Sequence, residues 1–297
     1  MSHPKTPREQ MVSLLETLTT AEGMRPSTLS GVHLLRVNES LARAPVVYDP
    51  SIVILAQGSK TGYLGDQIYT YDANNYLVLS VPLPFDCETH ASPGKPLLGV
   101  ALTVDPSTLA ELLLEMDDDA IPTPPAPAIY STPLTKELTG ATVRLLESLR
   151  SPLETRVLGP QIVREITYRV LRGEQSAALR AICTRHSHFA QIGKVLRRIH
   201  DEYSVALDVD TLAREASMSV STFHHNFRAV TSTSPLQYIK SIRLHRARLL
   251  MIREGLNAGV AARRVGYESS SQFSREFKRF FGETPAEGAA KVRALFG

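Results

Sequence analysis

The chain has 297 residues, which is enough for about two domains, and 43% hydrophobic residues can supply a core for each. Its longest apolar runs are far shorter than the roughly 20 residues that span a bilayer, and residues 1–10 lack the basic-then-apolar pattern of a secretion signal. Two cysteines, Cys87 and Cys183, cannot form a disulfide framework or a four-cysteine metal site. These features argue against a membrane or disulfide-rich protein and favour a cytoplasmic one.

Charge is unevenly distributed along the chain, although the formal net charge is only +3 at pH 7. Residues 185–297 hold 18 Lys/Arg against 10 Asp/Glu, whereas residues 1–184 hold 15 against 20. A basic C-terminal part beside an acidic N-terminal part indicates one domain that meets a polyanion and one that does not. The alternative is a soluble protein whose surface charge is merely uneven.

The N-terminal part is expected to begin with a short helix and to continue as strands. Thr6-Pro7-Arg8-Glu9 is a capping box, so an amphipathic helix should run from here to about Gly23. Short β-branched or aromatic runs, separated by Gly, Pro, Asn and Asp clusters, then follow. The expected strands are 32–37, 51–56, 67–71, 76–81, 85–90 and 97–104. Such a series without intervening helices predicts an antiparallel barrel or sandwich.

Helices dominate the expected structure after residue 104. One begins at Asp105-Pro106-Ser107 and reaches Glu115, and an irregular proline-rich excursion is expected over residues 117–133. The apolar stripes of residues 134–149 and 152–171 predict a helical hairpin broken at Ser151-Pro152. A short helix is expected over residues 174–183. The buried faces of the hairpin would pack either on the barrel or on a second copy of the chain.

The last third of the chain contains one pattern twice. Residues 221–228 (STFHHNFR) recur fifty residues later as residues 271–278 (SQFSREFK), with two Phe residues four apart in each copy. A repeat of this length indicates one supersecondary unit used twice, here a helix-turn-helix. The expected helices are 189–203, 211–216, 220–230, 235–254, 258–265 and 270–281. The four Phe residues should lie in the core.

This part of the chain resembles the AraC/XylS-type transcription regulators over roughly 100 residues. The residues that carry the resemblance are Leu212-Ala213, Phe223, Phe227, 234–250, Val265-Gly266-Tyr267 and 271–285. Two positions depart from the family pattern. Ser217 stands where the first turn often has Gly, and Gly288 stands where an aromatic residue is common.

The resemblance implies an all-α DNA-binding domain over residues 185–297, with two helix-turn-helix units that read promoter DNA. Two recognition helices joined by a rigid connector can enter successive major-groove segments, where base edges are distinguishable. By resemblance, the base-contacting residues are Ser221, His224 and His225 in the first unit and Ser270, Ser271, Ser274 and Arg275 in the second. The residues expected to contact phosphates are Arg228, Arg243, Lys278 and Arg279.

Residues 57–60 (QGSK), 69–72 (YTYD) and 76–84 (YLVLSVPLP) lie in the strand-rich part. With these residues, that part resembles the cupin-like N-terminal domain of one branch of this family. The resemblance implies an α+β, two-domain protein: an antiparallel β-barrel over residues 1–133 that senses a small molecule, and a helical dimerisation or linker region over residues 134–184. Metal-binding cupins carry a His-x-His with a nearby Glu, whereas His33 and His90 stand apart. No metal and no other cofactor is therefore expected. The candidate effector-sensing residues are Gln57, Lys60 and Cys87, and the effector would be a reactive aldehyde or another small organic molecule.

Cys87 is the one chemically reactive candidate in this part, and it lies between Asp86 and Glu88. Because two carboxylates disfavour a thiolate, a passive strand cysteine is weighed against a covalent or oxidative sensor. Strand alternation places His90, three residues on, on the opposite face.

The whole chain is thus expected to be a ligand-responsive, homodimeric transcription regulator and not an enzyme. We expect an activator that acts on RNA polymerase. The alternatives are a metal-free cupin-type enzyme or a repair protein fused to a DNA-binding module. A methyl-transfer repair protein would need a cysteine zinc site and a reactive-cysteine motif, which two cysteines cannot supply.

Overall fold

The computed structural model describes residues 5–92, 94–116, 128–173, 176–183, 188–288 and 290. These residues fall into two compact units. Unit 1 comprises Met1–Arg43, Asp49–Val81 and Cys87–Arg185, and unit 2 comprises Ala44–Tyr48, Pro82–Asp86 and His186–Gly297. The helical region that follows residue 134 therefore belongs to unit 1, with most of the strand residues.

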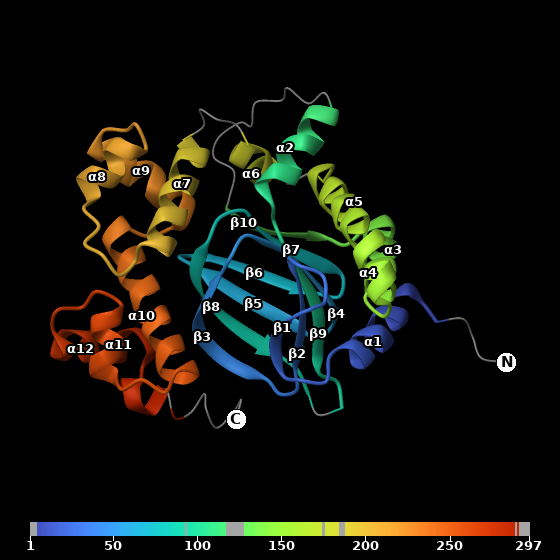
Figure 1. Ribbon diagram of the computed structural model, residues 1–297, viewed down its shortest axis with the longest axis horizontal. Helices are drawn as coiled ribbons and strands as arrows, with labels where there is room; N and C mark the ends of the chain where they lie inside the picture. Colours follow the sequence, from blue (N-terminus) through green and yellow to red (C-terminus); the bar gives the residue numbers. More distant parts are fainter. Residues whose placement is uncertain are drawn as a thin grey trace. The chain divides into compact units, whose positions relative to one another are not determined.

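An antiparallel sheet that curls into a half-barrel forms the centre of the N-terminal part (Figure 1). The strand order is β1-β2-β9-β4-β7-β6-β5-β8-β3, and β10 pairs with β7. The strands are β1 (Gly23–Pro26), β2 (Val32–Val37), β3 (Leu41–Tyr48), β4 (Ser51–Gln57), β5 (Ser59–Leu64), β6 (Gln67–Asp72), β7 (Asn75–Leu79), β8 (Leu83–His90), β9 (Leu97–Thr103) and β10 (Ile129–Pro133). The expected antiparallel β fold is confirmed, in the form of a curled half-barrel.

All six strands expected from the sequence are present, and β1, β3, β5 and β10 were not expected. In β5, buried and half-buried residues alternate, but two of the three buried positions hold Lys60 and Gly62. The sequence of β5 therefore lacks the apolar alternation from which a strand is predicted. β10 lies in the segment expected to be irregular, and residues 117–127 of that segment lie outside the described residues. Pairing of β10 with β7 decides its conformation, and that pairing joins residues some fifty positions apart.

The helices of unit 1 lie beside the sheet (Figure 1). They are α1 (Pro7–Leu18), α2 (Pro106–Glu115), α3 (Lys136–Ser148), α4 (Pro152–Val157), α5 (Gly159–Leu171) and α6 (Ala177–Cys183). The capping box at Thr6 and Glu9 is confirmed, with both reciprocal bonds present. α1 packs on β4, β9 and α3, and α3 packs on α5. Among the described residues, no helix is long and apolar enough to cross a membrane.

The prediction of a single helix over residues 152–171 is wrong, because the structure has two helices there, α4 and α5, which are separated at Leu158. Pro160 lies in the first turn of α5, where its missing N–H costs nothing, whereas inside a continuous helix it would remove a backbone hydrogen bond. Gly159 packs closely on Leu29, since a Cβ there would lie 2.8 Å from Leu29 Cδ2. The break therefore lets the chain approach residue 29.

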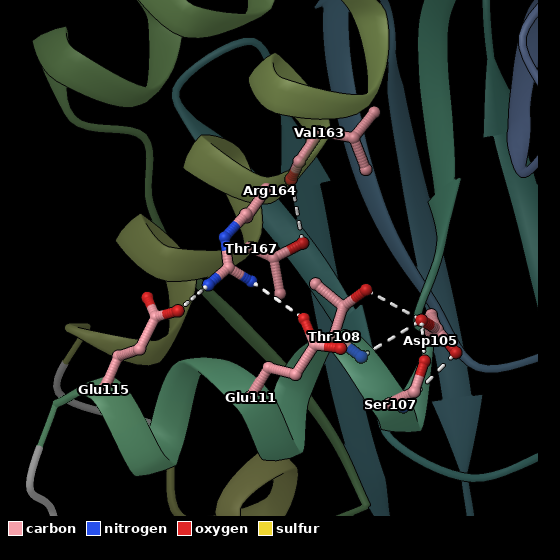
Figure 2. A network of polar contacts seen from close by, with 8 residues as sticks. All are labelled: Asp105, Ser107, Thr108, Glu111, Glu115, Val163, Arg164 and Thr167. Atoms are coloured by element: carbon pink, nitrogen blue, oxygen red, sulfur yellow. Dashed lines mark hydrogen bonds and ion pairs between the residues drawn. The ribbon is translucent and has the colours of Figure 1, made fainter.

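Polar contacts fix α2 against α5, as Figure 2 shows. The Asp105 carboxylate accepts the Ser107 and Thr108 hydroxyls at 2.6 and 2.7 Å and both of their backbone N–H groups. Hydrogen bonding, led by that of Ser107, lowers the pKa of Asp105 to about 2. From α5, the Arg164 guanidinium reaches the carboxylates of Glu111 at 3.5 Å and Glu115 at 2.7 Å. These ion pairs thereby connect α5 to α2.

Unit 2 contains the six helices expected for the repeated part, with ends that differ from the expected ones by at most two residues. They are α7 (His188–Asp201), α8 (Val209–Glu215), α9 (Val220–Thr231), α10 (Pro235–Arg253), α11 (Ala258–Arg264) and α12 (Ser270–Phe281). In Figure 1, α8 and α9 lie towards one end of α10, and α11 and α12 lie towards the other. The long helix α10 is thus a connector between two helix-turn-helix units.

Candidate nucleic-acid interface

The two helix-turn-helix units have equivalent turns. Ser217 in the first unit and Gly266 in the second both have left-handed backbones, with φ of 53° and 82°. In each turn, the N–H of the following residue donates to a carbonyl five residues back. These bonds, each 3.0 Å long, join Met218 to Ala213 and Tyr267 to Ala262. A repeat that was inferred from sequence is therefore a repeat of backbone geometry as well.

The second helix of each unit begins at a serine cap, at Ser219 for α9 and at Ser269 for α12. Each serine hydroxyl accepts the backbone N–H three residues later at 3.2 Å. The turn bonds are offset by 49 residues and these caps by 50, so the extra residue in the second unit is Glu268. Such caps satisfy N–H groups that a helix leaves unpaired at its start.

The Phe residues of the repeat form two matching core pairs. Phe223 and Phe227 have ring centroids 5.4 Å apart and an interplanar angle of 57°, and Phe273 and Phe277 have 5.5 Å and 56°. All four side chains are fully buried. The prediction that these residues are core rather than base-stacking residues is confirmed. The two pairs give α9 and α12 the same orientation relative to the core of their units.

The face opposite each Phe pair is exposed and polar. On α9 it carries Ser221, His224, His225 and Arg228, all exposed. On α12 it carries Ser270, Ser271, Arg275, Lys278 and Arg279, all exposed, and the half-buried Ser274. Spacing of three and four residues places such side chains along one helix face. The structure therefore brings the proposed contact residues of each unit together, apart from Arg243.

Four cations on these faces are available to an anion. In the part of unit 2 that the structure describes, the salt bridges involve other residues than Arg228, Arg275, Lys278 and Arg279. Exposed cations without a carboxylate partner can neutralise phosphates and release counterions, which strengthens binding to nucleic acid.

Arg243 has a different environment from the other three proposed phosphate contacts. Its guanidinium donates from Nε to the Tyr203 carbonyl at 2.8 Å, from Nη2 to the Val205 carbonyl at 2.8 Å and from Nη1 to the Gly266 carbonyl at 3.2 Å. Burial lowers the pKa of this group. The side chain joins the connector to the end of α7 and to the second turn. These three bonds give Arg243 a structural role, and the phosphate contact expected for it stays a prediction.

The terminal residues of the repeat are also ordered by a cap. The Thr284 backbone N–H donates to the Glu287 carboxylate at 2.8 Å, and the Glu287 N–H donates back to the Thr284 hydroxyl at 3.4 Å. Residues 285–288 are helical. A Cβ at the buried Gly288 would lie 2.9 Å from Glu283 Oε1, so the aromatic residue common at this position would displace that carboxylate.

The candidate effector residues of unit 1 divide into two sets. Lys60 on β5 and Cys87 on β8 are 6% and 5% exposed and occupy inward positions of neighbouring strands. Lys60 pairs across the sheet with Tyr71, which is fully buried. Gln57 instead donates from Nε2 to the Pro96 carbonyl at 2.8 Å, beyond the end of β4. Lys60 and Cys87 are therefore brought to one side of the sheet, while the Gln57 amide is held at the end of β4.

Two features near Cys87 bear on its chemistry. Its thiol lies 3.7 Å from the Glu88 carbonyl, and it is a free cysteine. His90 is exposed and lies 3.9 Å from the Glu88 carboxylate, so the expected placement of His90 on the opposite face is confirmed. Within the described residues, no three His, Cys, Asp or Glu side chains cluster where they could hold a metal.

Sequence reasoning missed two polar groups in unit 2, the half-buried Glu276 and the buried His245. Glu276 accepts hydrogen bonds from three side chains, and His245 is 9% exposed between Phe280 and Phe281. The one feature of the sequence that could have indicated a role for Glu276 is a difference between the two copies of the repeat. The first copy has Asn226 at the position where the second has Glu276.

Comparison with known families matches both parts of the chain. The model of the AraC-type transcriptional regulator N-terminus matches residues 28–178, and that of a helix-turn-helix domain matches residues 212–290. The RCS-specific HTH-type transcriptional activator RclR of Escherichia coli K12 is 38% identical over 105 residues, which are 35% of this chain and 37% of that protein. The Msm operon regulatory protein of Streptococcus mutans is 31% identical over 104 residues, again 35% and 37%. The match thus spans little more than a third of either relative.

Solved structures extend the similarity to most of the chain. An apo form of a ToxT point variant from Vibrio cholerae has a TM-score of 0.61 at 13% identity, over 90% of this chain and 97% of that one. Wild-type ToxT bound to an unsaturated fatty acid has a TM-score of 0.60 at 14% identity, over 86% and 92%. At this level of identity the likeness shows a shared two-domain fold.

Proposed function

Because the chain belongs to the AraC-type transcriptional regulators, we propose that it binds specific DNA sequences and regulates transcription in response to a small molecule. The family model for the N-terminal part covers just over half of the chain. The observation that carries the proposal is the pair of equivalent helix-turn-helix units, each presenting an exposed polar face whose cations form no salt bridge among the described residues. The relatives that match are transcription regulators, which supports a non-enzymatic role.

In the proposed complex, α9 and α12 enter successive major-groove segments of one duplex. Arg275 reads a guanine edge in bidentate fashion, because its exposed guanidinium matches two acceptors of that base. Ser221, His224 and His225 supply shorter or uncharged contacts in the first half of the site, and Ser270, Ser271 and Ser274 do so in the second. Arg228, Lys278 and Arg279 bind phosphates and set the position of the protein.

Selection of bound duplexes from a random DNA pool, with the full chain, tests this proposal. We expect one enriched asymmetric site of about 20 base pairs, since two recognition helices lie about one helical turn apart on such a site. Arg275→Ala should lower discrimination at one base pair by about 5- to 100-fold, as the loss of a bidentate contact predicts. Lys278→Ala should weaken binding to all sequences alike. An enriched site that Arg275→Ala reads as the wild type does would contradict the assignment.

For the effector, we propose a small organic molecule held on the inward side of the half-barrel near Lys60 and Cys87. The amine and the thiol are both nucleophiles, so a reactive aldehyde fits this pair. The unsaturated fatty acid bound to ToxT supports a small organic ligand for this fold. Mass spectrometry of the full chain after exposure to small aldehydes should find an adduct in peptides that contain residue 60 or 87. An unmodified half-barrel under conditions that alter DNA binding would rule out a covalent effector.

We also propose that the chain is a homodimer through α4 and the start of α5. This face exposes Leu153, Val157 and Leu158 by 61, 55 and 47%, and burial of such apolar surface favours association. Sedimentation of the full chain should give a dimer that Leu153→Glu with Val157→Glu makes monomeric. Ile68→Glu, at an apolar side chain 65% exposed on β6, is the matched control and should leave the dimer intact.

The output we propose is activation through RNA polymerase, because RclR is described as an activator. Transcription from a promoter that carries the selected site should rise when the chain is added to purified RNA polymerase. A fall in transcription would identify a repressor and leave the DNA-binding proposal in place.

A further inference from the structure

The carboxylate of Glu276, in the middle of α12, joins three segments of unit 2. Its Oε1 accepts from Lys240 Nζ at 2.9 Å and from Gln272 Nε2 at 3.2 Å, and its Oε2 accepts from the Tyr267 hydroxyl at 2.8 Å. Lys240 belongs to the connector α10, and Tyr267 belongs to the second turn. We name Glu276, Lys240, Tyr267 and Gln272 the Glu276 cluster.

The carboxylate at the centre of the cluster is largely covered and remains charged. The Glu276 side chain is 13% exposed and that of Lys240 is 37% exposed. Burial alone would raise the pKa of Glu276, but hydrogen bonds from Lys240, Gln272 and Tyr267 outweigh it, and the pKa is lowered. Burial, together with the same carboxylate, raises the pKa of the Tyr267 hydroxyl, which therefore stays a donor. A charged hydrogen-bonded carboxylate is a strong and directional link.

The first helix-turn-helix unit has a different link. At the equivalent position Asn226 donates from Nδ2 to the Thr222 carbonyl of its own helix at 2.9 Å and lies 3.9 Å from the Met218 sulfur. Within the described residues, its side chain makes no hydrogen bond to α10. Aromatic packing instead connects α9 to the connector, because the rings of Phe227 and Tyr238 meet edge to face with centroids 5.4 Å apart. Aromatic rings also pack between α12 and α10, where His245 meets Phe280 and Phe281, so what distinguishes the second unit is the added hydrogen bond from Lys240 of α10 to Glu276.

The position of Glu276 on α12 relates this link to base reading. Arg275, the residue proposed to read a guanine, precedes Glu276 directly, and consecutive side chains on a helix point about 100° apart. The hydrogen bonds that Glu276 makes to α10 and to the second turn add to the packing of Phe273 and Phe277 in setting the rotation of α12 about its axis. The direction in which Arg275 leaves the helix is set with it.

We infer that the Glu276 cluster positions the second recognition helix, and so determines how strictly the second half of the DNA site, and its spacing from the first half, are read. Glu276 acts through the orientation of α12 and does not touch DNA itself. The inference rests on the proposed DNA-binding function. It names a residue that would make the protein discriminate between bases more strictly in the second half of the DNA site than in the first.

The experiment compares Glu276→Ala with Asn226→Ala in the full chain. Binding is measured on the selected site, on sites with single base changes in either half, and on sites with one base pair inserted between the halves. Glu276→Ala should lower discrimination in the second half by about fivefold or more, because a reoriented Arg275 loses part of its bidentate contact. It should also tolerate the inserted base pair and leave discrimination in the first half unchanged. Asn226→Ala should do none of these. Equal losses in both halves for Glu276→Ala would overturn the inference.

Two further variants separate positioning from stability. Val265→Ala removes a fully buried apolar side chain of the same unit and serves as a destabilised control. This variant should have lower thermal stability but should still bind poorly to the site with one base pair inserted between its halves. Lys240→Glu combined with Glu276→Lys restores an ion pair between the two positions and should recover part of the discrimination that each single change removes. If Val265→Ala relaxes spacing as Glu276→Ala does, or the double change recovers nothing, the cluster is only structural.

Failure of the proposed function would look different from failure of this inference. In that case the wild-type chain would enrich no site at all, whereas a wrong inference leaves the wild-type site and changes only the response of the Glu276 variants.

Discussion

Ser217 and Gly266 share a left-handed backbone conformation at equivalent places in the two turns, with φ of 53° and 82°. Only one of these turns needs glycine for space. A Cβ at Gly266 would lie 2.4 Å from the Ser204 carbonyl oxygen, whereas Ser217 is exposed and already carries a Cβ. Glycine has no steric penalty in this conformation, and other L-residues do. The departure from the family pattern at Ser217 is therefore a tolerated strain.

Substitutions at these two positions should have opposite effects on stability. Ser217→Gly should be neutral or raise the free energy of unfolding by up to about 1 kcal/mol, because relief of strain is partly offset by a more flexible unfolded chain. Gly266→Ala should lower it by about 2 kcal/mol or more, through strain and the clash with residue 204. Hydrogen exchange of peptides from each turn, in the full chain, measures both. A Gly266→Ala variant as stable as the wild type would contradict the close approach of the two backbones.

Arg243→Lys should destabilise unit 2 although it keeps the charge. One ammonium group cannot reach the carbonyls of Tyr203, Val205 and Gly266 together, so at least one loses its donor. We expect a loss of about 2 kcal/mol in unfolding free energy. Arg243→Gln removes the charge, and at a temperature where this variant is folded the salt dependence of DNA binding should be unchanged. A slope reduced by about 1 for Arg243→Gln would instead identify Arg243 as a phosphate contact.

His245 should make the stability of unit 2 depend on pH. Burial, and then the charges of Arg248 and His200, lower the pKa of this side chain to about 3. The unfolded chain, with a pKa near 6.5, therefore binds one more proton than the folded chain between these values. Stability is fully present above about pH 6.5 and falls as the pH falls towards about 3, by about 2 kcal/mol between pH 7 and pH 5.

Urea unfolding of the full chain at pH 7 and pH 5 measures this effect. His245→Leu should lose about 2 kcal/mol less than the wild type between the two conditions. The exposed His224→Leu variant controls for removal of a histidine. An identical acid response of the wild type and His245→Leu would show that residue 245 does not determine it.

Arg228→Gln tests the phosphate contacts of the first unit. The exposed guanidinium should neutralise one phosphate, so its loss should reduce the slope of log affinity against log salt by about 1. Affinity should fall by a similar factor for matched and mismatched sites, because a phosphate contact carries no base information. A loss confined to one base pair would identify Arg228 as a base contact.

Much of the helical part could be predicted because its signals are local. The Phe pairs and the capping box of Thr6 and Glu9 are recorded in residues three or four positions apart, and the structure confirms them. The strands were predicted where apolar residues line them. β5 was missed because Lys60 takes an inward position, and β10 was missed because its conformation depends on β7.

By itself, the sequence determined that two helix-turn-helix units follow a strand-rich part, and which side chains of α9 and α12 lie opposite the core. Those properties depend on periodicity within a helix, which a linear pattern records. Only the tertiary structure decided that Arg243 holds three carbonyls and that Glu276 ties α12 to α10. Their partners lie 23 to 40 residues away in the chain for Arg243 and 36 for the Lys240–Glu276 pair. A charged side chain meets such partners through folding, so its residue type does not reveal whether it will face DNA or the protein.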